Sequence, residues 1–140
     1  MERGGYLSWD DSFVPDDEVI YRRVPDVPDF LVPDLLTGER RPTRTAFHWD
    51  DDGISVHRSS LLAKASLQPD CILRKSTQMV FGFKAEVPRS YSAEIVDDPQ
   101  LDDPPAGVAH ALIQCEPPRP PRPRRRIISE ALAQASVRIV

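Results

Sequence analysis

The sequence is poor in glycine and cysteine, and it has no long hydrophobic run. It holds six glycines and two cysteines against fifteen prolines in 140 residues. No apolar run reaches the ~18 residues that a membrane helix needs, so we expect no membrane partner. The first residues, MERGGYLSWDDSF, lack a hydrophobic stretch after a basic start, so we expect no signal peptide and a cytoplasmic location.

The motifs of several large enzyme classes are also missing. No GxxxxGK[ST], GxGxxG, GxSxG, HExxH or kinase motif occurs. Cys71 and Cys115 stand far apart and outside any metal-binding spacing, which indicates reduced thiols that pack as small hydrophobic groups. We therefore expect no cofactor and no metal ion, we assign no catalytic residue, and we take a non-enzymatic role as the stronger hypothesis.

The fifteen prolines exclude an all-helical bundle and an extended continuous sheet, because each one removes a backbone donor and fixes φ. The stretches between them are typical of short elements. They predict strands at 18–24, 78–85, 94–97 and 108–115, a helical turn at 87–93, and a helix at 59–67 with Ser59 or Ser60 as its N-cap. The predicted fold class is α+β: a small, mostly antiparallel sheet covered by one or two short helices.

Composition divides the chain into four segments. We predict an N-terminal arm at 1–17, one α+β domain at 18–116, a Pro/Arg-rich linker at 117–126 and a C-terminal helix at 127–140. The linker reads PPRPPRPRRR, whose proline density predicts a semi-rigid polyproline II spacer. The helix is predicted from apolar residues near helical spacing.

Residues 25–42 contain four prolines, three of which precede aspartate, a pairing typical of turns. A short helical turn is predicted at Pro33–Leu36. We expect five apolar side chains to attach this segment to the core: Phe30, Leu31, Val32, Leu35 and Leu36.

The segment TRTAFHWDDDGISVHR at 43–58 predicts a β-hairpin, because Asp52-Gly53 is a preferred turn dipeptide between alternating residues. Its apolar face would hold Phe47, Trp49, Ile54 and Val56. Its polar face would hold His48, Asp50, Ser55 and His57, with His48 opposite His57. We interpret this face as polar surface. Two histidines and a carboxylate could also hold a metal ion or contact a ligand, and His110 is the remaining histidine.

The order of Arg22/Arg23, Thr43–Thr45, Ser55 and Glu116 resembles the Arg–Ser–Glu plan of ADP-ribosyltransferase-like folds. That resemblance implies a first-strand arginine that holds dinucleotide phosphates and a late glutamate that stabilises a cationic transition state. The Ser-Thr-Ser tripeptide of that plan is absent here. A small ADP-ribosyltransferase-like or nucleotide-binding enzyme is the first alternative function.

Five arginines lie within 119–126: Arg119, Arg122, Arg124, Arg125 and Arg126. This run is typical of a solvated linker, of a contact with an acidic protein, or of a phosphate-backbone contact. The net charge of −4 and the absence of interleaved aromatic residues disfavour nucleic acid. Nucleic-acid binding is therefore the second alternative.

The stretch YRRVPDV…RRPTRTAFHWDDDGISVHRSSLL, with the later DDP…PAGVAHALI, resembles a set of short bacterial proteins with no known activity. The resemblance covers about residues 20–113. It implies that Arg23, Phe47, Ser55 and His110 are shared positions, and it assigns no activity. Small proteins of this sort often accompany larger genes in defence or toxin–antitoxin islands, which favours an accessory role by analogy.

The leading hypothesis is a non-enzymatic accessory or regulatory protein that binds a protein partner. The linker, the C-terminal helix and the proline-rich loop at 25–42 would make the contact, with the five arginines of 119–126 as partner-binding residues. The expected ligand-contact residues, should a ligand bind, are Arg23, His48, Ser55, His57 and His110.

Overall fold

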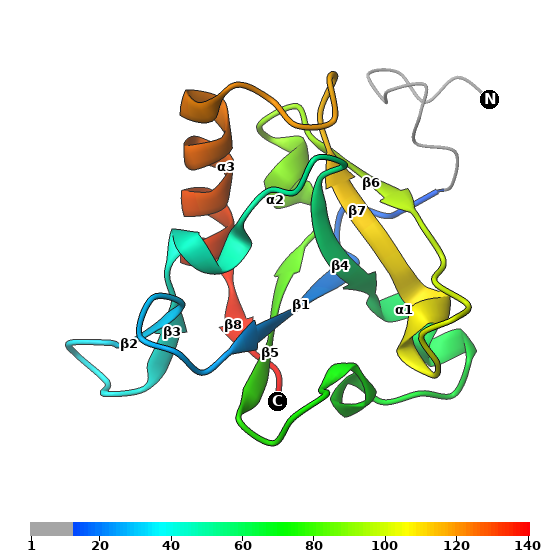
Figure 1. The fold of residues 1–140 in the computed structure, drawn as a ribbon, viewed down its shortest axis with the longest axis horizontal. Helices are drawn as coiled ribbons and strands as arrows, with labels where there is room; N and C mark the ends of the chain where they lie inside the picture. Colours follow the sequence, from blue (N-terminus) through cyan, green and yellow to red (C-terminus); the bar gives the residue numbers. More distant parts are fainter. Residues whose placement is uncertain (1–12) are drawn as a thin grey trace.

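The computed structural model describes residues 13–140, so most of the predicted N-terminal arm lies outside the described residues. It confirms the α+β class. Six strands form one antiparallel sheet (Figure 1). From one edge to the other they are β6 (Glu94–Asp97), β7 (His110–Gln114), β4 (Ile54–Arg58), β1 (Val19–Pro25), β5 (Gln78–Lys84) and β8 (Val137–Arg138).

Helices cover both faces of this sheet. They are α1 (Ser59–Lys64), α2 (Glu86–Arg89) and α3 (Arg122–Ala135), with 3₁₀ segments η1 (Arg44–Phe47), η2 (Pro69–Ile72) and η3 (Ala106–Ala109). Figure 1 shows α3 and α1 on opposite sides of the central strands. Among residues 13–140 there is no helix with the length and apolar character needed to cross a membrane.

Strand β1 separates two hydrophobic cores, because successive side chains of a strand point to opposite faces. Ile20 and Val24 face the larger core, which Ile128 and Leu132 of α3 complete. Tyr21 packs on the smaller core of the other face, whose buried members are Leu62, Ile72, Val80, Ala106 and Ala109. The ladder with β5 runs without interruption from Val19↔Lys84 to Pro25↔Gln78.

The predicted hairpin at 43–58 is wrong in its first strand. Residues 44–47 form η1, and the hairpin reduces to one bridge between Asp50 and Gly53, where Gly53 has a φ of +129°. Strand β4 instead pairs with β7 over four register pairs and with β1 over two. The four residues predicted for the apolar face, Phe47, Trp49, Ile54 and Val56, are nevertheless all buried, Phe47 from the 3₁₀ segment and Ile54 and Val56 from β4.

Three further expectations are also wrong. The segment Leu31–Pro33 is strand β2, which pairs with β3 (Arg40–Pro42). Leu35 and Leu36 were expected to attach this segment to the core, but they lie in the turn between the two strands and are 97% and 96% exposed. The Asp34 carboxylate accepts hydrogen bonds from the amides of Leu36 and Thr37, which fixes the conformation of that turn. The N-cap of α1 is Arg58, without a side-chain cap, instead of a serine.

The C-terminal segment also differs from the prediction. Helix α3 begins at Arg122, inside the predicted linker, and ends at Ala135, before strand β8. Proline is tolerated in the first turn of a helix, because the amide it removes has no intrahelical acceptor, so Pro123 does not delay the helix. The predicted polyproline II spacer is therefore wrong, because residues 116–119 are bends and residues 122–126 are helical.

Candidate functional site

The candidate site lies where β1 and β4 stop pairing. Their ladder contains only Ile20↔Arg58 and Tyr21↔His57. Beyond it, the Arg22 guanidinium takes the place of backbone hydrogen bonds: Nη1 donates to the Ser55 carbonyl at 2.7 Å and Nε to the Ala46 carbonyl at 3.1 Å. The split in the sheet is thus bridged by a buried cation.

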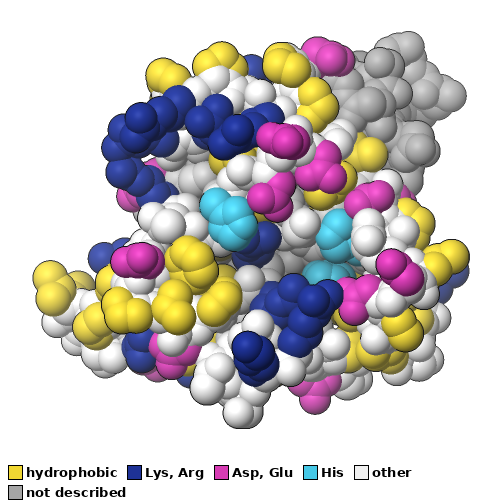
Figure 2. All heavy atoms as spheres, viewed as in Figure 1, with side chains coloured by type: hydrophobic (Ala, Val, Ile, Leu, Met, Phe, Trp, Pro, Cys, Tyr) yellow, Lys and Arg dark blue, Asp and Glu magenta, His cyan; other side chains and the backbone are white. Residues whose placement is uncertain are grey.

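A pocket of about 170 Å³ opens at this split. Figure 2 shows histidine side chains on either side of a hollow, with basic side chains within and below it. Four of the five predicted ligand-contact residues line the pocket, and the fifth, His48, lies 3.3 Å from Arg22 through its Nδ1. The complete lining is Arg22, Arg23, Ser55, His57, Arg74, Gln100, Asp103 and His110.

Strand parity explains why these residues meet. His57 is the register partner of both Tyr21 and His110, so the three side chains share one face. Arg23 lies two residues beyond Tyr21, and Ser55 two residues before His57, so they share that face as well. Arg23, Ser55, His57 and His110 are ligand-contact candidates from the sequence. The predicted hairpin placed His48 opposite His57, whereas in the structure β4 pairs with β7 and His110 lies opposite His57.

The two pocket histidines touch and differ in their hydrogen bonds. Their rings meet edge to face, with centroids 5.5 Å apart. His110 Nδ1 lies 2.9 Å from the Asp98 carbonyl and 3.2 Å from its carboxylate, which leaves Nε2 to the pocket. The ring nitrogens of His57 have no hydrogen bond to residues 13–140. Burial, followed by the charges of His110 and Arg23, lowers the pKa of His57 to about 4, so its ring is neutral at pH 7.

Positive charge dominates the lining. Three arginines face one carboxylate, that of Asp103. Burial lowers the pKa of Arg22 to about 10, which leaves it charged at neutral pH. Arg23 donates a hydrogen bond from Nη1 to the Ile72 carbonyl at 3.0 Å, and Arg74 donates one from Nη2 to the Asp103 carboxylate at 2.6 Å. The remaining donors of these side chains are suited to an anion.

The loop between β6 and η3 brings Gln100 and Asp103 to the pocket, and Gly107 fixes its shape. The Gly107 amide donates to the Asp103 carbonyl, and the Gln100 amide donates to the Gly107 carbonyl, both at 2.8 Å. A Cβ atom at Gly107 would lie 1.9 Å from the Gln100 carbonyl oxygen, so only glycine fits. No local sequence pattern marked Gln100, Asp103 or Arg74 as site residues.

The other predicted features lie outside this pocket. Glu116 is exposed beyond the far end of β7, so the Arg–Ser–Glu set is not brought together. Arg124 donates to the Tyr91 and Ser92 carbonyls, and Arg125 to the Pro120 carbonyl. Arg119 lies 3.9 Å from Asp51. Within residues 13–140, no three potential metal-ligating side chains form a cluster.

Fold and site together define a small α+β protein with a polar, arginine- and histidine-lined pocket in a split antiparallel sheet. Neither a family model, nor a curated protein, nor a solved structure matches the chain.

Proposed function

We propose that the protein binds the phosphate group of a small phosphorylated ligand in the pocket between β1, β4 and β7. The observation that carries this proposal is the convergence of Arg22, Arg23 and Arg74 with two histidines on one small cavity. Arginine presents planar pairs of donors that match a phosphate. Phosphate binding was part of the nucleotide-binding alternative that the sequence suggested. The glutamate of that alternative, Glu116, has no part in the proposal because it does not line the pocket.

The size and shape of the pocket fit a single phosphate. A volume of about 170 Å³ is below the range of about 300–1,000 Å³ typical of sites that enclose a drug-sized ligand. The edge-to-face contact of His57 and His110 leaves no room for a group between the rings. A bound anion therefore lies beside the histidine pair and not between the rings, where a neutral His57 can offer one N–H and the arginines supply the charged donors.

Replacing Arg74 with alanine is expected to weaken binding of inorganic pyrophosphate at least tenfold in isothermal titration calorimetry. The change removes a charge-assisted hydrogen bond, worth about 1.5–3 kcal/mol, and leaves Asp103 unpaired beside the anion. The Arg74 side chain is 57% exposed, so the variant should fold normally.

Arg41→Ala is the matched control, because Arg41 is an exposed arginine on β3 and does not line the pocket. It should keep the wild-type affinity. Equal affinity of wild type and Arg74→Ala, or a wild type that binds neither phosphate nor pyrophosphate, would refute the proposed function.

A second proposed function is the binding of a protein partner, as an accessory or regulatory protein of a bacterial defence or toxin–antitoxin-like system. Two adjacent leucines at the tip of the β2–β3 hairpin support it, since Leu35 and Leu36 are almost fully exposed. Exposed apolar groups of this kind are typical of contact sites. Arg119, Arg122 and Arg126 would add charged contacts, whereas Arg124 and Arg125 already bond to their own chain. The cytoplasmic location remains part of this proposal.

The double substitution Leu35→Ser/Leu36→Ser is expected to abolish capture of the partner from the native lysate, because it removes the apolar tip without touching the core. Affinity purification followed by mass spectrometry measures the loss. Leu101→Ser, at another exposed leucine (81%), should retain the partner. Binding that survives the double substitution, or that falls steeply with salt and needs nucleic acid, would argue against this function.

A further inference from the structure

An aromatic pair adjoins the pocket. The rings of Phe30 and His48 are stacked, with centroids 6.2 Å apart and planes 25° from parallel. Phe30 is half-buried, and His48 is exposed. His48 Nδ1 lies 3.3 Å from Nη2 of Arg22, whose guanidinium also lines the pocket. A group held in the pocket is therefore one side chain away from the exposed ring.

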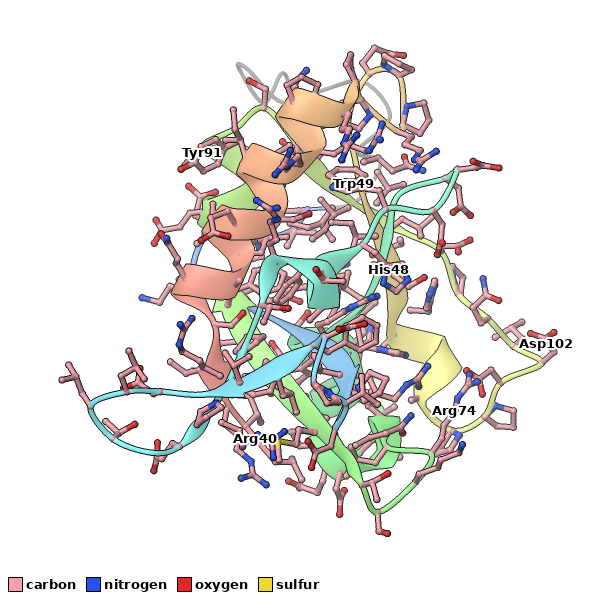
Figure 3. All side chains as sticks on the ribbon, turned by 60° about the vertical axis from the view of Figure 1, so that its left-hand side comes forward. Arg40, His48, Trp49, Arg74, Tyr91 and Asp102 are labelled. Carbon is pink, nitrogen blue, oxygen red and sulfur yellow. The ribbon has the colours of Figure 1, made fainter. Side chains whose placement is uncertain are left out.

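The pair is held in a fixed position. Thr43 links the two segments that carry it, since its amide donates to the Phe30 carbonyl at 2.9 Å and its hydroxyl to the Asp29 carbonyl at 2.6 Å. Next to His48, the Phe47 ring is completely buried in the core. In Figure 3, His48 and Arg74 lie on the side of the molecule turned away from Tyr91.

The chemistry of this surface suits a flat, uncharged ring. The contact of the His48 ring with its neighbours, which removes part of it from water, and the charge of Arg22 lower the pKa of His48, so the imidazole is neutral at pH 7. Nucleobases stack on aromatic side chains largely without regard to base identity. Arg22 stands between the phosphate pocket and this surface, so the sugar of a nucleotide would lie over its guanidinium.

Resting on the proposed function, we infer that the ligand is a nucleoside phosphate whose phosphate occupies the pocket of Arg22, Arg23 and Arg74 and whose base stacks on His48. The stacking surface selects nucleotides over other phosphorylated compounds. Ribose 5-phosphate carries the same phosphate and sugar without a base, so it separates the two parts of the site.

The test is isothermal titration calorimetry of the full chain with adenosine 5′-monophosphate and ribose 5-phosphate. The wild type should bind the nucleotide about tenfold more tightly. His48→Ala should reduce nucleotide affinity to that of ribose 5-phosphate, whose own affinity stays unchanged, and His48→Phe should keep the preference. Tyr91→Ala, at a half-exposed aromatic residue outside the phosphate pocket, is the matched control and should also keep it.

The outcomes distinguish the two proposals. Equal wild-type affinity for both compounds overturns the nucleotide inference and leaves phosphate binding intact. A preference that persists in His48→Ala overturns the role of His48 as the stacking surface. Binding of neither compound, together with no binding of pyrophosphate, refutes the proposed function itself. Circular dichroism of each variant verifies that the exposed substitution leaves the fold unchanged.

Discussion

Replacing Arg58 with alanine is expected to lower the free energy of unfolding by about 3–5 kcal/mol, measured by urea denaturation followed by circular dichroism. Arg58 and Glu18 are among the few charged side chains in the interior, with exposed fractions of 6% and 4%. Removing one partner of a buried pair leaves the other charge in the protein without compensation. A loss of this size is a large share of the stability of a domain of this length.

The geometry of Arg58 explains the expected cost. Its Nε and Nη2 donate to the two carboxylate oxygens of Glu18, both at 3.1 Å, and its Nη1 donates to Asp97 at 2.8 and 3.0 Å. Burial opposes the charge of Arg58, but the hydrogen bonds that it donates to the carboxylates of Glu18 and Asp97 outweigh this effect and raise its pKa. The guanidinium thus joins the edge strand β6 to the chain just before β1, across the end of β4.

Two variants sharpen this prediction. Glu18→Ala should cost about as much as Arg58→Ala, and the double variant should cost less than their sum, because each single change already breaks the same contact. Arg41→Ala, at an exposed arginine 3.8 Å from Asp34, should change stability far less. Similar small losses for Arg58→Ala and Arg41→Ala would mean that the buried pair does not stabilise the fold.

The sequence predicts strands better than their partners. The alternation in β1 and the apolar run of β5 mark both strands correctly, because the polarity pattern along one strand is a local property of the sequence. The hairpin at 43–58 fails because pairing is a competition: a turn dipeptide favours local pairing, whereas β7 offers β4 four register pairs. No local pattern reveals that Leu35 and Leu36 stay exposed, since that depends on where the β2–β3 turn points.

The same limit applies to the site. Arg23, Ser55, His57 and His110 could be selected as polar residues on predicted strands, and strand parity then placed them on one face. Arg74 and Gln100 come from loops whose position depends on tertiary contacts, such as the fit of Gly107 against the Gln100 carbonyl. Polar residues on predicted strands can thus be proposed from sequence, but which of those strands are neighbours, and which loops close a pocket over them, depends on tertiary contacts.

Protonation of His57 is expected to make the protein less stable as the pH falls from about 6.5 to about 4. The unfolded chain binds a proton at His57 near pH 6.5, whereas the folded chain binds it only near pH 4, because the ring is buried beside His110 and Arg23. Between these values the unfolded state holds more protons, so stability is complete above pH 6.5 and is lost as the pH falls. The difference between these two pKa values corresponds to a loss of about 3 kcal/mol in the free energy of unfolding.

Urea unfolding of the wild type and of His57→Gln between pH 7.5 and pH 4 measures this contribution, since carboxylates that titrate in the same range affect both proteins alike. The wild type should lose about 3 kcal/mol more than the variant. His48→Gln is the matched control, because His48 is exposed and should change the pH dependence much less. Parallel curves for the wild type and His57→Gln would contradict the burial of a neutral imidazole.

The same proton connects stability to the proposed ligand. A phosphate beside His57 would favour the imidazolium, because an opposite charge within a few ångströms stabilises the charged form of a group. The ligand-bound protein should therefore take up a proton on binding and show a shallower loss of stability towards pH 4 than the free protein. Calorimetry with pyrophosphate in buffers of different ionisation enthalpy measures that uptake, which should disappear in His57→Gln. Binding without proton uptake would place the anion against the arginines alone, away from the histidine pair.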